Sequence, residues 1–162
     1  MKENIYTKIE KVVVNSGIGR LSQQAGFEDK LLPEVEREFA AITGQRGALK
    51  NARISIAGFK IREGNTVGIM VTLRGKRMES FLKKVTNIVL PRVRDFRGID
   101  LKVVDQNGNL TIGLKEHLVF PEVSPETSKV GFGLQMTIVP KVQKRASAME
   151  IYKAIGVPFK KN

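Results

Sequence analysis

The hydrophobic side chains of this chain recur with two different periods, and this limits the fold more than any other feature of the sequence. Residues 66–73, TVGIMVTL, alternate apolar positions with small or polar ones, as a half-buried strand does. The ranges 9–15, 110–114 and 132–139 have the same character and predict further strands, the first leading into a turn over 16–19. The sequence therefore predicts four or five strands.

Three other segments carry apolar residues three and four positions apart, as one buried helix face does. They are 29–43, which Gly44 follows, 76–90, which Pro91 is expected to stop, and 146–155. Strands and helices in this mixed order predict an α+β fold. We expect a mostly antiparallel sheet with helices packed on one face and the other face open.

The composition is that of one globular domain with an unusual charge. The 162 residues are expected to form a single domain over 1–162 with a core of its own. Lysine and arginine number 28 against 16 acidic residues, a net charge of +12 that suggests a polyanionic partner. Residues 45–77 hold eight basic and one acidic side chain, and 141–162 hold six and one. These segments predict a charged face rather than a generally basic surface.

Several classes of chemistry are excluded or disfavoured. The chain has no cysteine and one histidine, so no disulfide, thiolate metal site or histidine cluster is expected, and no metal or cofactor. No apolar run approaches the length of a signal peptide or a membrane span, so we expect no membrane partner. The RGKR stretch at 74–77 lacks the glycine spacing and the Ser or Thr of a phosphate-binding loop.

Individual residues that could suggest catalysis have simpler interpretations. The single His117 is expected at the surface or a sheet edge. Glu34, Glu36 and Glu38 are expected on the solvated side of the first helix. Phe132, one ring among aliphatic residues, is expected to pack in the core rather than to stack bases. The sequence therefore predicts that the chain is not an enzyme.

The stretch SIAGFKIREG, 55–64, places apolar side chains among cations. Ile56 and Phe59 lie close to Arg53, Lys60 and Arg62. One interpretation is a loop that offers positive charge and a flat apolar contact to a folded nucleic acid. The other is that Ile56 and Phe59 fold under the loop as a small local core.

Seven stretches, in order along the chain, carry a family resemblance. They are VVVNSGIG, TGQR, NARISIAGFKIREG, VTLRGKRM, LPRVRDFRG, GNLTIGLKEHLVFPEV and GVPF. Together, over residues 5 to 159, the chain resembles the large-subunit ribosomal protein family numbered five, in its bacterial form, which binds 5S rRNA. The resemblance implies a structural protein of the cytoplasmic ribosome that helps attach 5S rRNA to the central protuberance. It also implies that the open sheet face and neighbouring loops contact 5S rRNA, with 23S rRNA nearby.

The resemblance implies three sets of contact residues. The rRNA-binding residues are expected to be Asn15, Ser16, Gly17, Gly19, Gln45, Arg46 and Lys50. The loop that touches the elbow of peptidyl-site tRNA is expected to use Arg53, Ser55, Ile56, Gly58, Phe59, Lys60 and Arg62. A bridge to a small-subunit head protein of the S thirteen family is expected near Arg92, Arg94 and Arg97, and near 107–123. Arg94 and Asp95 are expected to pair with each other.

The chain departs from the family pattern in three places. The helical segment that usually precedes the first strand is expected to be missing, Gly47 stands where proline is usual, and Ile54 replaces a basic residue of the tRNA loop. The last change weakens the inference of a tRNA contact. The alternative functions are a general basic RNA- or DNA-binding protein without a ribosomal role, and a small enzyme acting on nucleotides or RNA.

Overall fold

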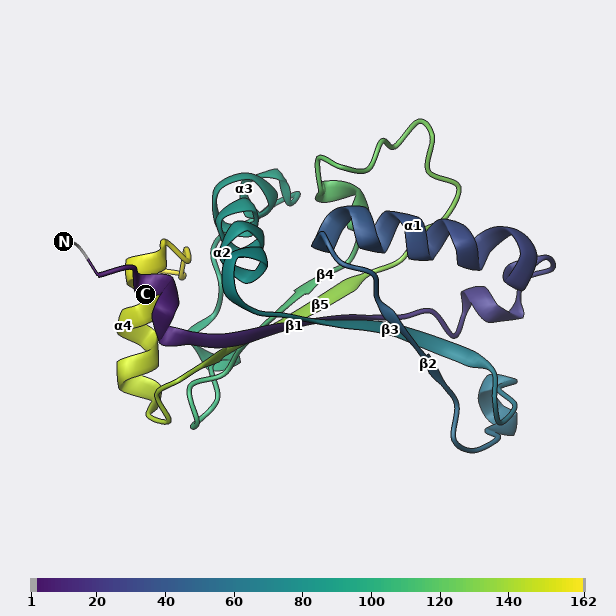
Figure 1. The fold of residues 1–162 in the computed structure, drawn as a ribbon, viewed down its shortest axis with the longest axis horizontal. Helices are drawn as coiled ribbons and strands as arrows, with labels where there is room; N and C mark the ends of the chain where they lie inside the picture. The colour runs from purple at the N-terminus through teal and green to yellow at the C-terminus, as the bar shows by residue number, and fades with distance from the viewer. Residues whose placement is uncertain (1–2, 162) are drawn as a thin grey trace.

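A computed structural model describes residues 3–161 and shows one antiparallel sheet of five strands with helices against it (Figure 1). The strand order is β2-β3-β1-β5-β4, so the first strand of the chain lies at the centre. The strands are β1 (Ile9–Gly17), β2 (Ala48–Asn51), β3 (Thr66–Leu73), β4 (Leu110–Leu114) and β5 (Leu134–Pro140). The predicted α+β fold with a mostly antiparallel sheet is confirmed.

The two-residue period of the strands divides the sheet into a covered and an open face. In β1, Val12 and Val14 are fully buried, whereas Val13 between them is half-buried. Val13 lies opposite Thr72 of β3 and Thr137 of β5. Because paired residues of antiparallel strands project to the same side, threonines and small residues line the face that the core does not use.

The helix α1 (Leu32–Thr43) covers one side of the sheet through an apolar stripe. Val35, Phe39 and Ile42 are fully buried, and Gly44 ends the helix in the left-handed conformation. A wide turn, η3 (Phe27–Leu31), precedes α1. The predicted helix over 29–43 is therefore confirmed, with its first turn wider than an α-helix.

The second helix continues past its predicted end. It comprises α2 (Gly75–Lys84), the wide turn η5 (Val85–Val89) and α3 (Leu90–Arg92). The prediction that Pro91 stops the helix is wrong. The N–H of Leu90 donates to the carbonyl of Val85, five residues back, and such a turn loosens the helix just where a proline ring would otherwise crowd it. The extra residue in this turn also rotates the apolar stripe, which leaves Ile88 exposed and Leu90 buried.

The last helix, α4 (Arg145–Ile155), crosses one end of the sheet beside both termini (Figure 1). The hydroxyl of its buried Tyr152 donates to the carbonyls of Gly108 and Ile138, which ties α4 to the loop before β4 and to β5. Burial raises the pKa of the Tyr152 hydroxyl, so this group remains a donor at ordinary pH. The predicted helix over 146–155 is confirmed.

The strand β2, which the sequence did not predict, has no strong sequence signature. Its residues ALKN include no β-branched side chain, and all four are exposed at the edge of the sheet. It forms by pairing with β3, and the two strands continue into a hairpin that bends away from the sheet (Figure 1). Gly47 allows this pairing, because a Cβ there would lie 2.8 Å from Phe39 and 2.6 Å from Ile69.

Short single turns complete the fold. They are η1 (Ile5–Lys8), η2 (Leu21–Gln23), η4 (Ala57–Phe59), η6 (Leu101–Val103) and η7 (His117–Val119). In the part of the chain that the structure describes, no helix has the length and apolar character needed to cross a membrane.

Candidate nucleic-acid interface

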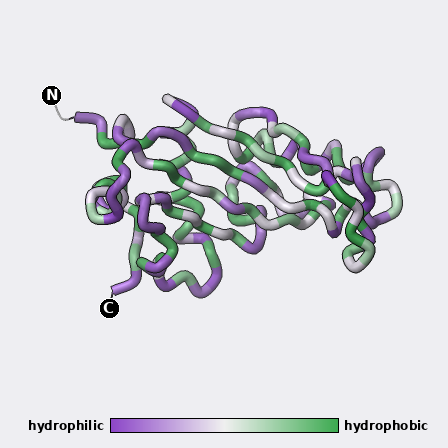
Figure 2. The backbone as a smooth tube through the Cα atoms, turned by 90° about the horizontal axis from the view of Figure 1, so that it is seen from below, coloured by the Kyte–Doolittle hydropathy of each residue, from purple (hydrophilic) through white to green (hydrophobic). Residues whose placement is uncertain are grey.

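The open face of the sheet is broad, weakly charged and rich in small polar groups. Seen from below in Figure 2, the strands lie side by side with α1 and α2 behind them. From the strand register, the side chains on this face are Lys11, Val13, Asn15, Gly17, Ala48, Lys50, Gly68, Met70, Thr72, Thr111, Gly113, Gln135, Thr137 and Val139. None of these is acidic, so the face can approach a polyanion without repelling it.

Amide and glycine groups gather at one position on this face. Asn15 lies opposite Met70 and Gln135, and Gln135 lies opposite Gly113. A hollow of about 400 Å³ holds Asn15, Gly17, Gly113 and Gln135 among its lining residues. Amides can donate to phosphates and 2′-hydroxyls and accept from them, and glycines leave the backbone accessible.

Of the other predicted rRNA-binding residues, Lys50 is part of this face, at its edge, and the rest lie around it. Ser16 faces the covered side, is buried, and donates its hydroxyl to the carbonyl of Gly133. Gly19 follows β1, and Lys50 lies opposite Gly68 on the edge strand. Gln45 accepts a hydrogen bond from Arg77 at 3.2 Å, and the side chain of Arg46 is 87% exposed with only a 3.7 Å contact to Glu36.

The hairpin over 52–65 is a small ordered element with its apolar side chains turned outward. Ile56 and Ile61 form a β-bridge, and the N–H of Glu63 donates to the hydroxyl of Ser55 at 2.9 Å. Phe59 is nevertheless 66% exposed. The interpretation that Phe59 folds under the loop as a local core is therefore wrong.

The hairpin also presents its predicted cations. Arg53, Lys60 and Arg62 are all exposed, and no carboxylate of the described residues lies within 4.0 Å of them. Gly58 is exposed at the tip, where Lys60 adopts a left-handed conformation with φ 53°. The amide of Gln23 donates to the carbonyl of Phe59 at 2.6 Å and fixes the tip to η2.

The predicted bridge residues lie on a different surface. Arg92, Arg94 and Arg97 are exposed around the end of α3, on the helix side of the sheet (Figure 1). The structure gives no ion pair between Arg94 and Asp95, and Asp95 adopts a left-handed φ of 55°. The predicted pairing of these two residues is wrong, and the three arginines are free of described carboxylates.

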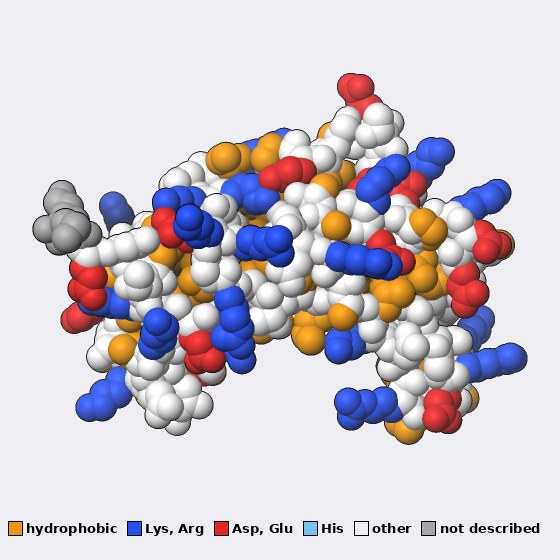
Figure 3. Space-filling model, in the orientation of Figure 1, with side chains coloured by type: hydrophobic (Ala, Val, Ile, Leu, Met, Phe, Trp, Pro, Cys, Tyr) orange, Lys and Arg blue, Asp and Glu red, His pale blue; other side chains and the backbone are white. Residues whose placement is uncertain are grey.

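The prediction of a single charged face is also wrong. Figure 3 shows lysine and arginine side chains at both ends of the molecule and over the helix side. The hairpin carries one basic group, and α4 with its flanking residues carries another at the opposite end (Figure 1). The positive charge therefore flanks the open face.

A buried polar cluster between α1 and η7 was missed by the sequence analysis. His117 is 1% exposed, and its Nε2 lies 2.6 Å from a carboxylate oxygen of Glu38, itself 7% exposed. Ser128 donates to the same oxygen at 3.0 Å. The expectations of a surface histidine and a solvated Glu38 are both wrong. The spacing in α1 could have predicted that Glu38 is buried, because Glu38 adjoins Phe39 and follows Val35 by three positions and so lies beside the apolar face.

This cluster does not have the geometry of a catalytic triad. Glu38 and Ser128 both approach Nε2 of His117, at 2.6 and 3.4 Å, whereas a triad uses the two ring nitrogens for different partners. The other nitrogen, Nδ1, is buried without a hydrogen-bond partner among the described residues. The ring stacks on Phe132 at 3.9 Å, and Phe132 is buried as predicted. The cluster therefore serves packing.

Comparisons with known proteins agree along nearly the whole chain. A family described as "Ribosomal protein L5" matches residues 6–62, and the C-terminal part of the same ribosomal family, described separately, matches residues 66–159. Among curated relatives, "Large ribosomal subunit protein uL5" of Halothermothrix orenii is 45% identical over 159 residues, covering 97% of this chain and 87% of the relative. The uL5 protein of Pseudothermotoga lettingae is 46% identical over 158 residues, covering 98% of this chain and 84% of that protein.

Proposed function

Because this chain belongs to the L5 family and is a structural protein of the large ribosomal subunit, we propose that it binds 5S rRNA through the open face of its sheet. In this role it helps attach 5S rRNA to the central protuberance, next to 23S rRNA. Membership of the family excludes the alternatives of an enzyme and of a basic protein without a ribosomal role.

The observation that carries the proposal is the chemistry of the open face. A-form RNA exposes 2′-hydroxyls and phosphates in a wide, shallow groove, which a flat surface of amides, hydroxyls and bare backbone can follow. Asn15, Gln135 and Thr137 supply these groups from neighbouring strands, with Gly17 further along β1 and Gly113 opposite Gln135 on β4. Two exposed cations, Lys50 on the edge strand of the face and Arg46 beside it, can neutralise phosphates.

Two further contacts belong to the same proposal. The hairpin over 52–65 touches the elbow of peptidyl-site tRNA, with Arg53, Lys60 and Arg62 on phosphates and Phe59 against exposed bases. Arg92, Arg94 and Arg97 contact a small-subunit head protein of the S thirteen family. Their place on the helix side leaves them accessible when RNA occupies the open face.

The direct test is the replacement of Asn15 by leucine. Asn15→Leu should lower the affinity for 5S rRNA about tenfold, because an unmade hydrogen bond in an interface costs on the order of 1–3 kcal/mol. Filter binding at fixed salt measures the change. Asn87→Leu makes the same substitution at an exposed position of η5 on the helix side and should leave the affinity unchanged. Equal affinities for the two variants would contradict the assignment of the open face.

A further inference from the structure

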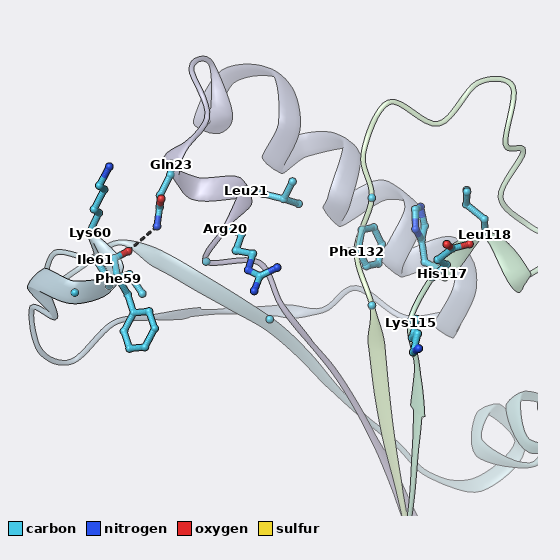
Figure 4. Close-up of a pocket in the computed structure, with 16 residues that line it drawn as sticks. Arg20, Leu21, Gln23, Phe59, Lys60, Ile61, Lys115, His117, Leu118 and Phe132 are labelled. Atoms are coloured by element: carbon cyan, nitrogen blue, oxygen red, sulfur yellow. Dashed lines mark hydrogen bonds between the residues drawn. The ribbon is translucent and has the colours of Figure 1, made fainter. Parts of the chain in front are cut away.

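A deep cleft lies between the hairpin tip and the segment that leads into β5. It has a volume of about 1110 Å³, and Figure 4 shows Phe59 on one side, Phe132 on the other and Arg20 extending between them. Four segments of the chain form it: the end of β1 with the following turn, the hairpin tip, the segment around Lys115 and the segment around Gly131. Its volume is that of a ligand site, and it is too small to enclose a duplex.

Three of the glycines that line this cleft stand at positions where the fold itself does not require glycine. Gly17, Gly58 and Gly131 have ordinary backbone conformations, and a Cβ added to any of them would meet no atom within 4 Å. Glycine is entropically costly, by roughly 0.5–1 kcal/mol relative to alanine within a strand. Since neither the backbone nor the interior requires glycine here, a closely approaching ligand is the remaining reason for the bare backbone.

The charge of the cleft selects an anionic ligand. Arg20, Lys60 and Lys115 line it and are exposed, and the described residues place no carboxylate within 4.0 Å of them. Glu116 is the one acidic lining residue. Because exposed, uncompensated cations release counterions when they meet phosphates, the cleft favours a phosphate-bearing chain.

From these features we infer that the cleft binds an unpaired RNA segment. The sugar–phosphate backbone runs along the three glycines, its phosphates lie against Arg20 and Lys115, and an unstacked base rests on the exposed ring of Phe59. This inference rests on the proposed RNA-binding function. It adds Arg20, Lys115 and Gly131 to the residues that contact RNA. It also means that the hairpin and the end of β1 form two walls of one binding site.

The test compares a fluorescein-labelled RNA decanucleotide, single-stranded or annealed to its complement, in anisotropy titrations with the full chain at about 150 mM salt. Arg20→Gln with Lys115→Gln should weaken single-strand binding roughly tenfold and flatten its salt slope by about 1.4, the value for two phosphate contacts. Gly131→Val should weaken binding without lowering the melting temperature, because the added side chain points into open space. The matched controls are Lys30→Gln with Lys76→Gln, at exposed sites of η3 and α2 outside both basic ends, and Ala146→Val, at an exposed site of α4.

Two results would overturn the inference: an equal loss in the control charge variant, or single-strand binding no tighter than duplex binding. Titration of 5S rRNA in parallel separates this inference from the proposed function. Selective 5S binding without decanucleotide binding would reject the cleft alone, and decanucleotide binding that depends on Arg20 and Lys115 would support the cleft whatever the result with 5S rRNA.

Discussion

At the scale of single residues, the buried contact between His117 and Glu38 joins the segment 115–133 to α1. Removing one partner leaves a buried polar or charged group without compensation, so Glu38→Ala should lower the free energy of unfolding by about 3–5 kcal/mol. Urea unfolding measures this loss. The double replacement of both residues by leucine should cost less than the sum of the single changes, because it leaves no orphaned group. A loss for Glu38→Ala within about 0.5 kcal/mol would show that the pair is not a stabilising contact.

Asp105 contributes to the loss of stability in acid. Desolvation raises the pKa of its carboxyl, but hydrogen bonds from Asn109, Asn107 and Gly108 outweigh this and hold the pKa below its ordinary value. The stability from this group is therefore present above the ordinary pKa of about 3.9 and is lost as the pH falls through the lowered value. Asp105→Asn should make unfolding less sensitive to pH below about 4. Asp29→Asn, at an exposed site with no described side-chain hydrogen bond, should leave the acid limb unchanged.

Residue patterns predicted some of these positions and not others. Val12 and Val14 were predictable because strand alternation fixes the side on which each side chain lies, and Phe132 because it is a single ring among aliphatic residues. Glu38 and His117 were not, because their contact joins residues 79 apart and depends on how α1 sits over the loop after β4. The sequence could not decide whether Phe59 is exposed either, because the residues around a hairpin tip do not determine whether an aromatic ring there points inward or outward.

At the scale of elements, the hairpin and the end of α1 should bind RNA without supporting the fold. Arg46→Ala with Arg53→Ala should weaken RNA binding and change the melting temperature little, because Arg46 makes only one loose surface ion pair and Arg53 makes none among described residues. Filter binding and thermal unfolding on the same samples give both quantities. A large fall in melting temperature would assign these arginines to the fold.

The hairpin tip allows a separate test of the tRNA contact. Phe59→Ala should weaken binding of intact tRNA by roughly tenfold, because stacking of a base on an aromatic ring contributes on the order of 1–3 kcal/mol. Val103→Ala removes another exposed apolar side chain, in η6, and serves as the control. Unchanged tRNA affinity in Phe59→Ala would count against the hairpin as the contact.

Element boundaries followed the sequence only where the backbone was regular. The apolar face of the helix predicted over 76–90 was right except at Ile88, which the wide turn η5 leaves exposed in a way that periodicity does not encode. The strand β2 was missed because its residues have little strand preference and it depends on pairing with β3. The open face itself was predictable from strand alternation.

At the scale of the whole molecule, the fold places the open face and the basic side chains on different parts of the surface. A weakly charged face of amides, hydroxyls and glycines lies between the hairpin and α4, which both carry lysines or arginines, so RNA can be attracted by the ends and recognised by the face (Figure 1). The charge distribution along the sequence located the two basic segments but could not show that the fold sets them apart. Their separation follows from the sheet, which carries the hairpin at one end and α4 at the other.

Recognition by the open face is best measured in a competition between 5S rRNA, an unrelated RNA hairpin and duplex DNA for the full chain at about 150 mM salt. We predict that 5S rRNA is bound preferentially over both competitors, with log K falling against log salt by about 0.7–0.9 for each phosphate contacted. Equal affinity for the three nucleic acids, with the same salt slope, would mean that only the cations bind and that the open face recognises nothing.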